Sequence, residues 1–95
     1  MDTSSFVLIE KEVVGSLHFP SEDVLTSESD KAQRKTAVDR AISLGNLEHY
    51  KVKIYFADAE GEKLVHTTIW AVTDEAIVLK QNVVIPFKRI IKLEI

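Results

Sequence analysis

The sequence predicts a mainly β fold of the α+β class, in which one helix precedes a strongly bent, five-stranded antiparallel small barrel. Three patterns predict it: an apolar stripe at helical spacing in residues 30–45, strict alternation in residues 51–56, and the run 63–72, which is apolar on both faces. A strand that buries different faces at its two ends bends from one side of a barrel to the other.

The helix is predicted from about Asp30 to Leu44. Ser29 or Asp30 is expected as its N-cap, because a short side-chain oxygen can accept from the free N–H groups of the first turn. Gly45-Asn46 is expected to end the helix, since both residues tolerate positive φ. The apolar stripe consists of Ala37, Val38, Ala41 and Ile42.

The strands are predicted from alternation and from turn residues. In residues 51–56 every second residue is apolar, so Val52, Ile54 and Phe56 lie on one face. The turn at 58–61 ends on Gly61, the expected positive-φ residue. Residues 73–75 make the next turn after the long run 63–72, and Gln81-Asn82 is expected to close a hairpin.

The two ends of the chain are read in the same way. Pro86 is expected at a sheet edge or break because it cannot donate a ladder hydrogen bond, and residues 86–89 suit a tight helical turn before a last strand at 90–95. The β-branched residues of 6–14 suggest a further strand. One domain is expected over residues 1–95, with an extension at 1–28, the helix at 30–45 and the barrel at 50–95.

Composition bounds the function classes. Residues 1–49 carry nine acids against five bases, and residues 50–95 carry six against seven, so the chain lacks the overall basic footprint of a duplex nucleic-acid binder. The chain has no cysteine, its three histidines are widely spaced, and its three glycines are isolated. We therefore expect no catalytic residues, no cofactor and no metal site. With neither a signal peptide nor an apolar run of about 20 residues, we expect a cytoplasmic protein without membrane contact.

The order of elements, with Ile85-Pro86-Phe87-Lys88-Arg89-Ile90 before the last strand, resembles the Sm-like fold, whose barrel is of the SH3-like type. The likeness covers residues 30–95 and extends to the Rho-binding antiterminator family. The segments 44–52 and 67–73 also resemble a group of short uncharacterised bacterial proteins. The resemblance implies an Sm-like barrel. The turns at 73–75 and 81–82 depart from the family, because they lack its Asp/Asn and Arg-Gly nucleotide-pocket residues.

The first candidate interaction surface lies on the long strand. His66, Thr68 and Trp70 share one face of it, and Tyr55 is expected on the neighbouring strand. If outward, this face suits protein contact or base stacking. The alternative, that Trp70 packs on the helix stripe as core, is the commoner fate of a large aromatic residue in a small domain.

Two further features are candidates for binding. The helix carries a basic cluster that suits an anionic surface, although acids interleave with it: Lys31, Arg34, Lys35 and Arg40. The last strand, 90–95, offers an edge for homo-oligomer formation by strand addition. Against this, Lys92 and Glu94 are candidates for gatekeepers, and residues 6–14 are a candidate cover for that edge.

The sequence thus favours a non-enzymatic small-barrel module that binds a protein partner, in transcription or RNA regulation. The alternative is a single-stranded RNA-binding Sm-like protein. A small hydrolase would require a pocket that gathers His49 or His66 with a carboxylate.

Overall fold

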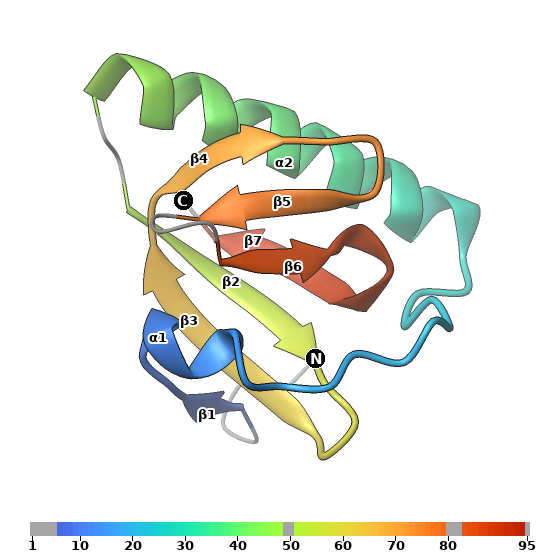
Figure 1. The fold of residues 1–95 in the computed structure, drawn as a ribbon. Coiled ribbons are helices and arrows are strands. Elements are labelled where there is room, and N and C mark those ends of the chain that lie inside the picture. The colour runs from blue at the N-terminus through green and yellow to red at the C-terminus, as the bar shows by residue number, and fades with distance from the viewer. Residues whose placement is uncertain (1–5, 49–50, 80–82, 95) are drawn as a thin grey trace.

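The computed structural model describes residues 6–48, 51–79 and 83–94, and the side chains of all of these except 44–48. It has one main helix and is of the α+β class, as predicted (Figure 1). In chain order the elements are β1 (Val7–Leu8), α1 (Lys11–Val14), α2 (Glu28–Glu48), β2 (Val52–Ala57), β3 (Glu62–Thr67), β4 (Ile69–Val72), β5 (Ala76–Leu79), β6 (Val84–Pro86), the 3-10 helix η3 (Phe87–Arg89) and β7 (Ile90–Glu94).

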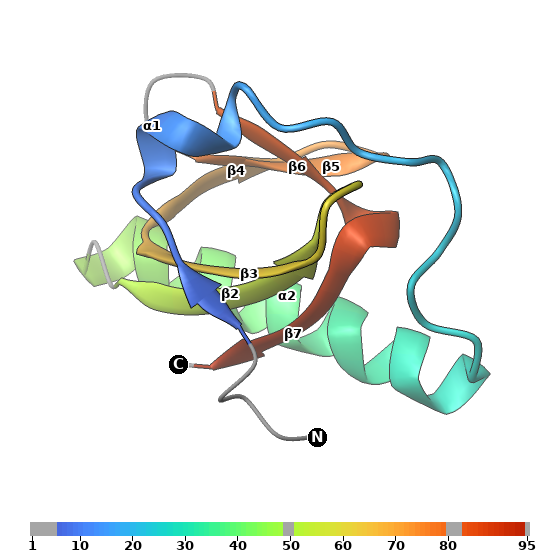
Figure 2. The same ribbon diagram turned by 90° about the horizontal axis from the view of Figure 1, so that it is seen from below.

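The seven strands of the described chain form two sheets. One sheet has the order β1-β3-β2-β7 and the other β4-β5-β6. All neighbours are antiparallel except β1 and β3, which run parallel. The prediction of five strands in a barrel is therefore wrong in number, and in the residues that the structure describes no ladder joins the two sheets into a closed barrel. The sheets instead face each other across the core (Figure 2).

Residues 63–72 do pass from one sheet to the other, but the prediction that the two ends bury different faces is wrong. The chain passes from β3 to β4 through Thr68 alone, yet β3 belongs to the first sheet and β4 to the second. Val65, Thr67 and Ile69 turn their side chains to the buried side on both parts of the bend. One continuous run therefore supplies two layers of the molecule.

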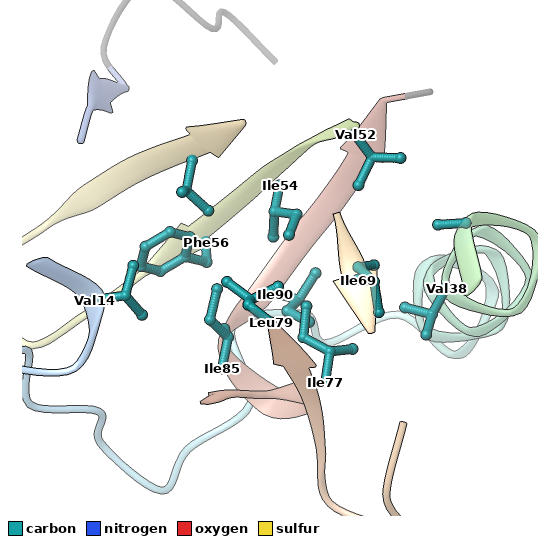
Figure 3. Packing of buried hydrophobic residues seen from close by; sticks show 12 residues of the cluster. Val14, Val38, Val52, Ile54, Phe56, Ile69, Ile77, Leu79, Ile85 and Ile90 are labelled. Atoms are coloured by element: carbon teal, nitrogen blue, oxygen red, sulfur yellow. The ribbon is translucent and has the colours of Figure 1, made fainter. Parts of the chain in front are cut away.

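The core fills the space between the two sheets and is sealed by the helices (Figure 3). Its alternating members on β2 are the three that the sequence pattern selects, Val52, Ile54 and Phe56. Burial of one such side chain contributes roughly 1.5–3 kcal/mol. The cluster consists of Val14, Val38, Ala41, Val52, Ile54, Phe56, Val65, Ile69, Ile77, Leu79, Ile85 and Ile90.

Helix α2 packs on β7 and β4, which are edge strands of the two sheets. Val38 and Ala41 of the predicted stripe are buried, and Ala37 and Ile42 are partly buried. Both predicted ends are wrong. The helix begins two residues early, at Glu28, where the Ser27 hydroxyl accepts from the Asp30 N–H at 3.4 Å, and it continues past Gly45 to Glu48.

The amino-terminal segment departs most from the sequence prediction. Only Val7–Leu8 of the expected strand over 6–14 forms a strand, and α1 begins three residues later at Lys11. Because β1 pairs with β3, it does not cover the edge of β7. Val14 enters the core from α1 and seals one end of the space between the sheets.

Residues 15–27, here called the strap, run from α1 along the sheets to α2 (Figure 2). The buried Arg89 donates from Nε to the Ala57 carbonyl and from Nη1 to the Glu22 carbonyl, both at 2.9 Å. The Val24 N–H donates to the Lys88 carbonyl at 2.8 Å. The strap therefore depends on η3 for its position.

The turns follow the predicted residues. Gly61 has a φ of 151°, and the Asp58 carboxylate accepts from the N–H groups of Glu60 and Gly61. The Thr73 hydroxyl likewise accepts from the N–H groups of Glu75 and Ala76. Pro86 ends the edge strand β6, and η3 is the expected tight helical turn. The predicted turn at Gln81-Asn82 lies outside the described residues.

Candidate interaction surface

Trp70 lies on the outside of the molecule, because strand alternation turns it away from the side of the buried Ile69, and the register of β4 shifts at the same place. Ile69 pairs with Leu79 and Ala71 pairs with Val78, so two residues advance on β4 while one advances on β5. Trp70 is the extra residue. A bulge re-aims side chains and is common beside functional sites. Trp70 is 53% exposed while Ile69 before it is buried, and the prediction of Trp70 as core is therefore wrong.

The exposed indole lines a depression of about 510 Å³ at the corner between β3 and β4. The exposed Leu8 of β1 and the half-buried Ile9 that follows it supply apolar surface there. Lys51 and His66 supply polar and cationic groups, and both are exposed. We call this site the Trp70 surface and define it by Leu8, Ile9, Lys51, His66, Thr68 and Trp70.

The backbone of β3 is open to this depression at His66. The Leu64 carbonyl accepts from the Ile9 N–H at 2.9 Å, so Leu64 turns its backbone polar groups toward β1. Alternation along a strand gives His66 the same direction. In the described chain the β1 ladder stops at Leu64, and no backbone bond from the segment after β1 extends it to His66. The depression thus offers main-chain groups beside an aromatic side chain.

Tyr55 does not belong to this surface, although the sequence analysis grouped it there. Its side chain is buried, and the Phe6 ring stacks on it edge to face at 5.0 Å and 81°. The Lys92 ammonium lies 4.7 Å from the centre of the tyrosine ring. Tyr55 therefore anchors the amino-terminal segment to β2, while His66, Thr68 and Trp70 do line one depression.

The basic cluster on α2 is largely engaged within the protein. Arg34 forms a bidentate pair with Asp23, with both N–O distances at 2.9 Å, and donates to the Ile90 carbonyl at 3.1 Å. Its side chain is only 9% exposed. Lys31 lies 3.8 Å from Glu28 and Lys35 lies 3.8 Å from Asp39.

Arg40 is exposed and lines a different depression, beside Glu94 of β7. The four cations of the predicted cluster therefore do not form one free anion-binding face.

The two most strongly held carboxylates are structural. The hydrogen bonds from the Arg34 guanidinium lower the pKa of Asp23 to about 2 from its ordinary value of 3.8. At Asp58, burial acts to raise the pKa, but hydrogen bonds from two backbone N–H groups and from the Lys63 ammonium lower it overall. Neither carboxylate lines the Trp70 surface.

Nothing in the described residues gathers ligands for a metal ion, since no three His, Cys, Asp or Glu side chains meet there. His18 and His66 lie on different elements and His18 does not line the depression, whereas His49 lies outside the described residues. No helix in this part of the chain combines the length and apolarity that a membrane crossing requires.

Sequence reasoning missed the rim that Leu8, Ile9 and Lys51 provide. The two exposed apolar residues of β1 were the available signal, because a short hydrophobic run interrupted by Glu10 fits neither a buried strand nor a helix face. Leu8 and Ile9 lie beside Trp70 because β1 pairs parallel with β3. That pairing joins residues as far apart in sequence as Val7 and Lys63, which are separated by 56 positions. No family model, curated protein or solved structure matches this chain.

Proposed function

We propose that this chain is a non-enzymatic interaction module that binds a protein partner through the Trp70 surface. The observation that carries the proposal is the exposed indole of Trp70, which lines a depression on the surface. Large exposed apolar groups raise the free energy of the unbound protein, and tryptophan is among the residues that most often dominate the energy of protein interfaces.

The composition of the surface fits a peptide segment with one apolar anchor. Leu8, Ile9 and Trp70 supply the apolar walls, and the exposed Lys51 supplies a cation at the rim. The outward backbone groups of His66 suit main-chain hydrogen bonds to an extended segment. Such a combination of an apolar centre with a polar rim is the usual anatomy of a protein interface.

We further propose that the module is of the Sm-like small-barrel type. The support lies in the order of elements from α2 to β7, in the bent pair β3–β4, and in the 3-10 turn η3 between the last two strands. A fold hosts many functions, so this relation adds a setting in transcription or RNA regulation only as a proposal.

Protein binding is favoured over RNA binding by charge. A protein that binds single strands combines aromatic stacking with a basic groove along the backbone. Lys11 and Lys51 line the depression, but Lys11 already pairs with Glu12 at 2.9 Å and Glu10 lines the same depression. The net charge of the chain is −3. One stacking residue without a basic track favours a protein ligand.

The test compares Trp70→Ala with Val84→Ala, which removes exposed apolar surface on β6 away from the depression. Each tagged full-length variant is used to capture proteins from nuclease-treated extract of the source cells, and the captured protein is then purified and titrated against each variant. We expect Trp70→Ala to weaken the binding roughly thirtyfold or more, as loss of a central interface residue does, and Val84→Ala to leave it unchanged.

Two results would contradict the proposal. One is a partner that binds wild type and Trp70→Ala equally well. The other is tight binding of a labelled single-stranded RNA at low salt that weakens steeply as salt is added, because that dependence is the signature of phosphate contacts.

A further inference from the structure

The Trp70 surface carries a cation that the protein itself leaves unpaired. Lys51 is exposed, and no carboxylate of the described residues forms an ion pair with its ammonium. The other lysine that lines the depression, Lys11, already pairs with Glu12 at 2.9 Å. On β2, the ammonium of Lys53 lies 3.9 Å from Glu94. Lys51 is therefore the lysine of this surface that a ligand can engage.

The strand register explains why Lys51 has no carboxylate beside it. Within the described chain, the ladder between β2 and β7 ends where Lys53 faces Glu94. Lys51 lies two residues before Lys53, on the same face and past that carboxylate. On the other side of β2, the register with β3 continues toward Lys51 with Thr68, which carries no charge. Lys51 thus reaches the corner at which β3 passes into β4 and lines the depression together with Trp70.

A carboxylate lines the depression from the opposite side. Glu10 follows β1, and the sheet order places β3 between β1 and β2, so Glu10 and Lys51 lie on the two sides of His66. Glu10 is exposed, and its side chain forms no cap hydrogen bond with α1. The depression is therefore polarised, with a cation on its β2 side and an anion on its β1 side.

Given the proposed function of the Trp70 surface, on which this inference rests, we propose that the partner segment carries an acidic residue on one side of its apolar anchor and that Lys51 selects it. An acid on that side meets the Lys51 ammonium, whereas an acid on the other side meets Glu10 and is repelled. Complementary charges at the rim of an interface speed association, and like charges exclude wrong partners. A nucleic acid, which is anionic along its whole length, is disfavoured by the same carboxylate.

Selection from a library of random peptides displayed on phage tests this chemistry directly. The library is enriched in parallel on immobilised full-length wild type, Lys51→Glu and Trp70→Ala. Wild type is expected to enrich peptides in which Asp or Glu falls on one constant side of an apolar residue. Lys51→Glu should enrich Lys or Arg at that position instead, and Trp70→Ala should enrich neither class.

A synthetic peptide taken from the wild-type selection measures the size of the effect. Its dissociation constant should rise roughly fivefold or more in Lys51→Glu, because an exposed attraction becomes a repulsion. Replacing the acid of the peptide by lysine should restore most of its binding to this variant. The matched control is Lys88→Glu, which changes the net charge equally at an exposed position outside the depression and should leave the dissociation constant unchanged.

Three results would overturn the inference while leaving the proposed binding function intact. Peptides that require Trp70 could carry no acid, could carry acids on both sides of the anchor, or could bind Lys51→Glu as tightly as wild type. Two other results would contradict the proposed function and the inference together. These are enrichment of the same peptides on wild type and Trp70→Ala, and a wild-type protein that enriches no peptide.

Discussion

The pair between Asp23 and Arg34 shows how single residues hold this fold. The guanidinium lies between the strap and β7, since it also donates to the Ile90 carbonyl. The Leu25 N–H donates to the same carboxylate at 2.8 Å. Charge-assisted bidentate pairs are stronger and more directional than exposed ion pairs. Arg34 therefore links three segments that are distant in sequence.

Asp23→Asn is expected to lower the free energy of unfolding by about 2 kcal/mol at pH 7. The pKa of Asp23 is about 2 in the folded protein and 3.8 in its ordinary state. Because the folded pKa is lowered, the stabilisation is complete above about pH 5 and is lost as the pH falls through about 2. Urea unfolding of wild type and variant at pH 7 and pH 3 measures this difference.

The matched control is Asp39→Asn, which breaks the exposed pair with Lys35. Exposed pairs contribute little, so this variant should change stability by less than about 0.5 kcal/mol at either pH. A difference between Asp23→Asn and wild type that is as large at pH 3 as at pH 7 would show that the carboxylate charge is not the cause.

The residue scale is also where the sequence was least informative. The alternation of Val52, Ile54 and Phe56 identifies a buried face because period 2 is local. The binding role assigned to Arg34 was replaced by a structural one, because its partner Asp23 lies 11 residues away across a loop. Sequence spacing contains no information about that contact.

Among the elements, the strap depends most on a few hydrogen bonds. It contributes Leu17 and Phe19 to the periphery of the core, and Arg89 fixes its carbonyl at Glu22. Segments with few buried contacts open locally more often than core strands do. The strap should therefore respond first when its hydrogen bonds are removed.

Arg89→Met keeps much of the side-chain volume but leaves the Ala57 and Glu22 carbonyls without their donor. We expect it to cost about 2–4 kcal/mol of stability. Hydrogen exchange should become faster at the N–H groups of Val24 and Ala59. The first donates from the strap to the Lys88 carbonyl, and the second donates to the strap at the His18 carbonyl. The exposed neighbour substitution Lys88→Met is the control and should change neither quantity. Unchanged exchange in Arg89→Met would show that the strap is held by other contacts.

The elements also divide into those that sequence predicts and those that it does not. Helix α2 was predicted at its centre, where its apolar stripe lies, but it extends past Gly45. A bend within residues 63–72 was predicted, but for the wrong reason, because Val65, Thr67 and Ile69 keep one set of alternate side chains buried through it. The bulge at Trp70 was not predicted, because one extra residue in a strand leaves no pattern in the sequence that distinguishes it from a regular strand.

At the scale of the whole molecule, two sheets and a helix enclose one apolar cluster while Trp70 stays outside it. A large aromatic residue is usually buried, so the sequence favoured the opposite placement. That general rule holds for Phe56 and fails for Trp70, because Phe56 and the aliphatic side chains of the cluster form the core while Trp70 lies outside it. An indole that the core does not need is available for a partner.

The most direct test of this account is quenching of the intrinsic fluorescence of Trp70, the single tryptophan of the chain. Acrylamide titrations are compared between the folded protein and the protein in urea. With 53% of the residue exposed, the account predicts a quenching constant in the folded state of about half the unfolded value. A folded protein whose fluorescence is almost unquenched would place Trp70 in the core and contradict the proposed interaction surface.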